Sequence, residues 1–104
     1  MSSVDNSDLR QWDIGVWITV RLPASVETAT HRKITIRKPN GASVIWDAVQ
    51  RPTNTDIGYQ TVSGDLDVPG EWDIQGWVKM EGGEWTTTRG SFVVGESIAQ
   101  IVIT

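Results

Sequence analysis

The segment Gly64–Lys79, which reads GDLDVPGEWDIQGWVK, has the clearest strand pattern in this 104-residue chain. Leu66, Pro69 and Gly70 form a corner, in which the leucine can fill one end of a core while the Pro-Gly pair turns the chain. After the corner, apolar side chains at Trp72, Ile74 and Val78 alternate with polar ones at Glu71, Asp73, Gln75 and Lys79. A period of two residues predicts an amphipathic β-strand with one buried face.

The same alternation continues on both sides of that segment. Apolar side chains occupy the even positions from Trp12 to Leu22, and shorter strand patterns follow at 33–38, 43–49, 57–62 and 98–104. Gly, Pro and Asn separate these patterns, and no window shows the apolar period of an amphipathic helix. We therefore expect an all-β protein, an immunoglobulin-like antiparallel β-sandwich of about seven strands, with a closed barrel as the alternative.

The connection after Lys79 is predicted to be a hairpin with a three-residue loop, Glu81–Gly83. This loop length sets Lys79 opposite Trp85 and keeps Phe92 in the inward phase, where a core needs it. The same register makes Trp77 and Trp85 diagonal neighbours on the outward face of adjacent strands.

Composition limits the classes of function. The chain has no cysteine, one histidine and a formal net charge of −4, from nine Lys and Arg against thirteen Asp and Glu. Disulfides and thiolate metal sites are excluded, and an acidic chain does not favour nucleic acid or an anionic membrane as partner. The length predicts a single domain at 12–104, preceded by a polar segment, 1–11, that we expect to be a flexible N-terminal arm.

Tryptophan is the unusual residue, with six copies beside one Phe and one Tyr. Strand phase predicts that Trp12, Trp46 and Trp72 belong to the core. It places Trp17, Trp77 and Trp85 outward, where exposed aromatics mark an interaction surface, with Arg37 and Lys79 at its rim. The alternative is that a loop or the arm covers these three indoles, or that a bulge reverses the phase of one strand.

Few residues are suited to catalysis. His31 lies in a polar segment without a partner cluster, and no serine occupies a nucleophile elbow. Asp65 and Asp67 are expected to cap a turn rather than bind a metal. The basic residues Arg32, Lys33, Arg37 and Lys38 are expected to pair with carboxylates of this chain or of a partner. We therefore expect no enzymatic activity and no cofactor or metal.

The C-terminal segment 98–104, IAQIVIT, is uncharged and has a strong β-propensity. An unpaired edge of this composition invites aggregation, so we expect it to be paired. Two partners are open: the strand that contains Trp17 within the same chain, or a neighbouring subunit's sheet, which Ile101 and Ile103 would augment.

Several motifs in order suggest a family: Ile36–Gly41, Trp46–Ala48, Gly58–Thr61, Gly64–Asp67, Pro69–Trp72, Ile74–Gln75 and Phe92–Gly95. Over 13–95 the chain resembles small immunoglobulin-like virion proteins of tailed bacteriophages. It is similar to the N-terminal domain of the upper baseplate protein and to free-standing immunoglobulin-like head or tail decoration proteins. Unlike the longer members, it is expected to carry no fibre or receptor-binding domain after Gly95.

This resemblance implies a structural role in the virion: a decoration or adaptor module that docks onto a capsid, neck or tail/baseplate assembly. The expected partners are therefore phage capsid, neck or tail proteins, with self-association also open. The alternative function is a carbohydrate-binding module that attaches to cell-surface glycans by stacking sugar rings on the exposed tryptophans.

Overall fold

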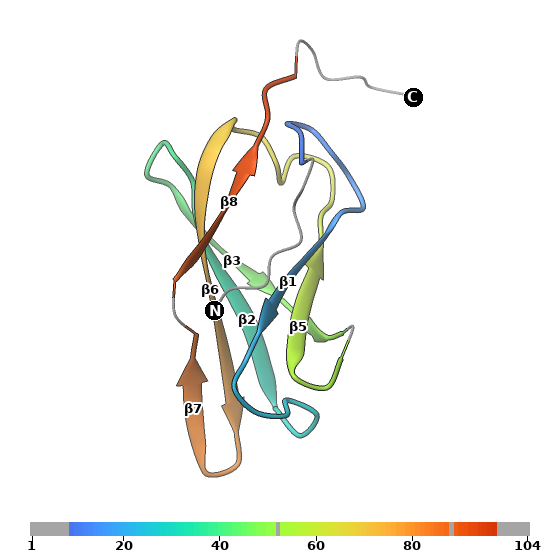
Figure 1. Ribbon diagram of the computed structural model, residues 1–104, viewed down its shortest axis with the longest axis vertical. Coiled ribbons are helices and arrows are strands. Elements are labelled where there is room, and N and C mark those ends of the chain that lie inside the picture. The colour runs from blue at the N-terminus through green and yellow to red at the C-terminus, as the bar shows by residue number, and fades with distance from the viewer. Residues whose placement is uncertain (1–8, 52, 88, 98–104) are drawn as a thin grey trace.

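The computed structural model describes residues 9–51, 53–87 and 89–97. Within these residues the chain is all-β, with strands connected by turns and loops (Figure 1). The strands are β1 (Trp17–Arg21), β2 (His31–Arg37), β3 (Ser43–Asp47), β4 (Val49–Gln50), β5 (Asp56–Gln60), β6 (Gly70–Met80), β7 (Gly83–Thr86) and β8 (Gly90–Val94). No helix able to span a membrane is found in this part of the chain.

Two antiparallel sheets make up the sandwich. The small sheet has the strand order β1-β5-β4, and the large sheet has the order β3-β2-β6-β7, with β8 also paired to β6. The eleven-residue β6 is long enough to pair with β8 along its first half and with β7 along its second half (Figure 1). The predicted fold class, an immunoglobulin-like antiparallel β-sandwich, is confirmed.

The core lies between the sheets, where the even-numbered side chains of β1, β2 and β6 meet the odd-numbered side chains of β5. Its fully buried members include Ile18, Val20, Ile34, Ile36, Ile57, Trp72, Ile74 and Val78. The sheets lie close together at Gly76, where an added Cβ would lie 3.1 Å from Val20 Cγ1. Trp46 is also buried and stacks on Tyr59 with ring centroids 4.4 Å apart. The predicted core positions of Trp46 and Trp72 are confirmed.

The long strand predicted from Trp12 to Leu22 is wrong in its first half. Strand β1 begins only at Trp17, and Ile14 is 62% exposed. Trp12 has a φ of 75° and is half-buried, and its N–H donates to Leu66 O at 2.7 Å. The predicted core position of Trp12 is therefore also incorrect, because this positive φ breaks the extended path that the alternation implied.

The predicted register of the β6–β7 hairpin is wrong by one residue. The loop has two residues, Glu81 and Gly82, and Trp85 lies opposite Val78 rather than Lys79. Phe92 nevertheless points inward, because β8 is shifted relative to β7. Thr86 pairs with Trp77 and Gly90 pairs with Ile74. The chain therefore advances by four residues between β7 and β8, whereas the paired positions on β6 are three residues apart. This extra residue is a bulge that reverses the side-chain phase.

The chain ends differ in part from expectation. Leu9 is buried, and Arg10 forms a parallel bridge with Gly95. The N–H of Gln11 donates to Gly95 O at 2.7 Å, and the N–H of Gly95 donates to Leu9 O at 2.9 Å. Residues 9–11 are therefore held against the end of β8 and are not a flexible arm. Residues 1–8 and 98–104, including the candidate pairing residues Ile101 and Ile103, lie outside the described part of the chain.

Candidate functional site

The large sheet presents the odd-numbered residues of β2 and β6 on the side opposite the core. Its register sets Lys33 opposite Trp77 and Arg37 opposite Asp73. The exposed side chains of β3 and β8 extend this surface, with Ile45 66% exposed and Val93 57% exposed. We call this surface the outer face; its members are His31, Lys33, Thr35, Arg37, Ser43, Ile45, Asp47, Glu71, Asp73, Gln75, Trp77, Lys79, Glu84, Thr86, Ser91 and Val93.

Three of the predicted interface residues, Arg37, Trp77 and Lys79, share the outer face. Trp77 is half-buried between β2 and β7. Its indole Nε1–H donates to Glu84 Oε1 at 3.2 Å, and its ring lies 6.4 Å from the His31 ring. These contacts hold the indole at a fixed place on the sheet, as an anchor residue in an interface requires.

Trp17 lies on the other side of the molecule, on the outside of the small sheet. Its ring packs against Gly58, where an added Cβ would lie 3.3 Å from Trp17 Cε3. The guanidinium of Arg51 lies over the ring, with Cζ 3.9 Å from the ring centroid. This is a cation–π contact within the chain. Trp17 is thus half-buried by a loop residue, as the alternative prediction for these indoles allowed.

Trp85 is in a third location. It pairs with Val78, whose side chain faces the core, so Trp85 is in the inward phase. It remains 41% exposed because it lies at the end of the β6–β7 hairpin, with its ring against Gly83. Trp77 and Trp85 therefore project from opposite sides of the sheet, and the expected common platform of Trp17, Trp77 and Trp85 is not formed.

The four basic residues in and directly after β2 have different environments. Lys33 pairs with Asp47, and Lys38 Nζ lies 2.7 Å from Asp67 Oδ1. Arg32 turns inward and donates to Val26 O at 2.8 Å. The expectation that basic residues pair with carboxylates of this chain is confirmed for the two lysines. Among the described residues, no ion pair is formed by Arg37.

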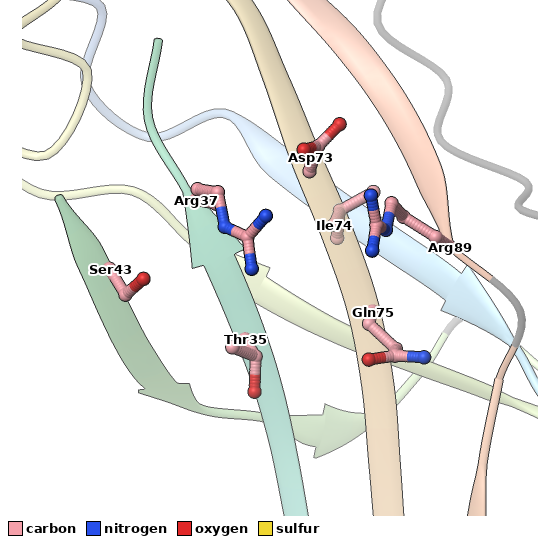
Figure 2. Close-up of a pocket in the computed structure, with 7 residues that line it drawn as sticks. All are labelled: Thr35, Arg37, Ser43, Asp73, Ile74, Gln75 and Arg89. Atoms are coloured by element: carbon pink, nitrogen blue, oxygen red, sulfur yellow. The ribbon is translucent and has the colours of Figure 1, made fainter. Parts of the chain in front are cut away.

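A shallow hollow of about 70 Å³ opens on the outer face beside Arg37. Figure 2 shows Arg37 reaching over it from β2 and Arg89 reaching toward β6 from the residue before β8. The other residues that line it are Thr35, Ser43, Asp73, Ile74 and Gln75. Gln75 is fixed there, because its Nε2 donates to Thr87 O at 2.8 Å. Sequence reasoning selected Arg37 but missed Arg89, which no local pattern connects to β2.

The remaining candidates for chemistry have structural roles. Asp65 accepts the Val62 N–H at 2.7 Å and the Tyr59 hydroxyl proton at 2.6 Å, so the predicted turn-capping role of Asp65 is confirmed. Burial, together with Asp65, raises the pKa of Tyr59 to about 12. His31 Nδ1 lies 3.1 Å from the Thr30 hydroxyl. Across the described ranges, no cluster of three or more His, Cys, Asp or Glu residues could hold a metal ion.

Comparison with known proteins supports the fold but not a family. No family model matches the sequence, and no curated protein is a significant match. Among solved structures, CopC from Methylosinus trichosporium OB3b has a similar fold, with a TM-score of 0.59 and 14% sequence identity. The similarity covers 97% of this chain and 100% of that one. At this identity, the comparison shows a shared β-sandwich fold and nothing about function.

Proposed function

We propose that this chain is a non-enzymatic structural protein of a tailed-phage virion. It acts as a decoration or adaptor module and docks through its outer face onto a capsid, neck or tail/baseplate assembly. Two observations support this proposal: the order of motifs from Ile36 to Gly95, which resembles small immunoglobulin-like virion proteins, and the composition of the outer face.

The outer face carries the proposal because it combines the parts of a protein–protein interface on one surface. Trp77 supplies a fixed aromatic anchor, and Ile45 and Val93 supply exposed apolar area on the flanking strands. Lys79 lies two residues along β6 from Trp77, and Arg37 lies farther along the same face, opposite Asp73, so both supply charge at the edge of this surface. Interfaces of moderate affinity have this arrangement of apolar anchors within a polar rim. Many copies on a symmetric particle would add weak single contacts through avidity.

The geometry favours protein docking over glycan binding. A flat sugar-stacking platform requires several indoles on one surface, whereas Trp17, Trp77 and Trp85 lie on three different surfaces. Trp77 is also half-buried and engaged with Glu84, which leaves a small part of its ring for stacking. Glycan binding is therefore treated as one of the results that would contradict the proposed docking function.

Co-sedimentation tests the proposal. The purified chain is incubated with capsids and, separately, with tails of the phage that encodes it, prepared without this protein. We expect the wild type to sediment with one of them, and Trp77→Ala to lose at least about tenfold in apparent affinity, as removal of an anchor residue does. Trp85→Ala is the matched control, because it removes an equal indole outside the outer face.

Two results would contradict this function. One is wild-type protein that stays in the supernatant with both particles. The other is a saturable change in tryptophan fluorescence on titration with host cell-wall polysaccharide, lost in Trp77→Ala, which would assign the outer face to sugar binding. Urea unfolding of each variant confirms that it is folded.

A further inference from the structure

We propose that the hollow between Arg37 and Arg89 is a binding site for a single carboxylate group, presented as an acidic side chain by the protein on which this module docks. This inference rests on the proposed docking function and deepens it, because it names the chemical group that the outer face recognises. It concerns a local site on the sheet that can be tested on the isolated chain.

Arg37 and Arg89 bring positive charge to the hollow that no ion pair in the described part of the chain uses. Within residues 9–51, 53–87 and 89–97, ion pairs are formed by Arg21, Lys33 and Lys38, and neither Arg37 nor Arg89 takes part in one. Both guanidinium groups nevertheless line one hollow, although Arg37 belongs to β2 and Arg89 precedes β8. Two like charges directed to one place repel each other, and an anion between them removes that repulsion.

The charge and the volume of the hollow suit a carboxylate. The hollow contains one carboxylate, Asp73, so its formal charge is +1 from two arginines and one aspartate. That balance suits a monoanion and disfavours a phosphate dianion, which Asp73 would repel. Its volume of about 70 Å³ has room for several waters, since about 10–15 Å³ of space for its centre admits one water. A carboxylate, which is the size of a few waters, fits this space.

The hydrogen-bond donors around the hollow also match a carboxylate. A guanidinium presents a planar pair of N–H groups that matches the two oxygens of a carboxylate. Thr35 and Ser43 add hydroxyl donors on the β2–β3 side of the hollow, where Figure 2 shows them beside Arg37. Gln75 has one amide N–H committed to Thr87 O, which keeps the side chain in place at the lower edge of the hollow in Figure 2. Donors thus surround the space from three strands.

The experiment is an NMR titration of the isolated full chain at constant ionic strength. The probe is the tripeptide Gly-Glu-Gly with an acetylated N-terminus and an amidated C-terminus, and the neutral control is blocked Gly-Gln-Gly. We expect the side-chain Nε–Hε signals of Arg37 and Arg89 to shift saturably with the Glu peptide and not with the Gln peptide. Arg37→Gln and Arg89→Gln should each weaken binding about tenfold or more.

Lys79→Gln is the matched control, since it removes the same charge from the same face outside the hollow, and it should weaken binding by less than about twofold, as screened surface charges do. Equal shifts with both peptides, or equal losses in all three variants, would overturn the site. Tighter binding of inorganic phosphate than of the Glu peptide would overturn the assignment to a carboxylate.

Co-sedimentation with particles then tests the partner. The proposal expects Arg37→Gln and Arg89→Gln to reduce particle binding in the same order as peptide binding. Peptide binding without any effect on particle binding would show that the hollow is not used in docking, and would overturn that part of the inference. Particle binding by wild-type protein that ignores the Glu peptide would leave the docking function standing and refute the carboxylate site.

Discussion

The two sheets of the sandwich expose very different outer surfaces. The outside of the small sheet is partly covered by its own chain: Arg51 lies over Trp17, and Gly58 beneath that indole is buried. Asp56 is also buried on this side, although it pairs with the exposed Arg21. The outer face of the large sheet has no such cover among the described residues, and Ile45 and Val93 are open to solvent there.

The compared charges on the two sheets have different roles. On the small sheet they are paired with each other and stabilise the fold, whereas on the large sheet they are unpaired within the described residues and available for binding. On the small sheet, Arg21 Nε donates to Asp56 Oδ1 at 3.1 Å, and the Thr53 hydroxyl donates to Asp56 Oδ2 at 2.8 Å. On the large sheet, Arg37 and Asp73 lie opposite each other without forming an ion pair. A folded chain commonly satisfies its buried polar groups, so unpaired charges gathered in an exposed hollow are the better candidates for function.

The largest effect that this comparison predicts comes from removing one aspartate on each side. Asp56→Ala should lower the free energy of unfolding by about 2 kcal/mol, because the Arg21 and Thr53 hydrogen bonds to a buried carboxylate are lost. Asp73→Ala should change it by less than about 0.5 kcal/mol, because the side chain is partly exposed and has no ion pair. Urea unfolding followed by tryptophan fluorescence measures both. Equal losses would show that the two surfaces do not differ in this way.

The core of the sandwich could be predicted from the sequence. The inward residues of β2 and β6, such as Ile34, Ile36, Trp72 and Ile74, follow the period of two without interruption. Trp12 could not be placed, since its positive φ depends on a hydrogen bond to Leu66, far away in the sequence. The alternation of apolar and polar residues predicts which face of a regular strand a side chain occupies. The prediction is wrong where the backbone is not extended.

The candidate site was less predictable for a similar reason. The phase of Trp85 depends on the length of the hairpin loop, and that of Phe92 on a bulge between Thr86 and Gly90, neither of which leaves a clear local signal. The hollow joins Arg37 to Arg89, two residues brought together only because β2 and β8 both pair with β6. Strand order depends on contacts between residues that are far apart in the sequence. The sequence therefore predicted that Arg37 faces outward, but it could not show that Arg89 lies beside it.

A second test uses pH and the contact between the sheets. Tyr59 of the small sheet stacks on Trp46 of the large sheet, and burial and Asp65 raise the pKa of its hydroxyl from 10.0 to about 12. The folded state therefore favours the neutral phenol. Its contribution to stability is complete below pH 10 and is lost as the pH rises from 10 toward 12, because the unfolded chain releases the proton first.

Tyr59→Phe should remove this part of the alkaline loss of stability. Urea unfolding between pH 9 and pH 11.5 measures it in both proteins, with about pH 7 as the reference at which the phenol is neutral in both states. The single tyrosine also permits a direct absorbance titration of the phenol in the folded chain. An apparent pKa near 10 in that titration, or identical pH profiles for the two proteins, would refute the coupling.

The smallest expected effect concerns an exposed apolar residue on an edge strand of each sheet. Ile45 of β3 lies on the outer face. Val49 of β4 lies on the small sheet, opposite Gly58. The side chains of Ile45 and Val49 are both exposed. Ile45→Thr and Val49→Thr keep β-branching, so each should alter the free energy of unfolding by less than about 0.5 kcal/mol. Only Ile45→Thr should weaken particle binding, by about fivefold, because it removes apolar area from the docking surface. Equal binding by the two variants would place β3 outside the contact, and a loss confined to Val49→Thr would move docking to the small sheet.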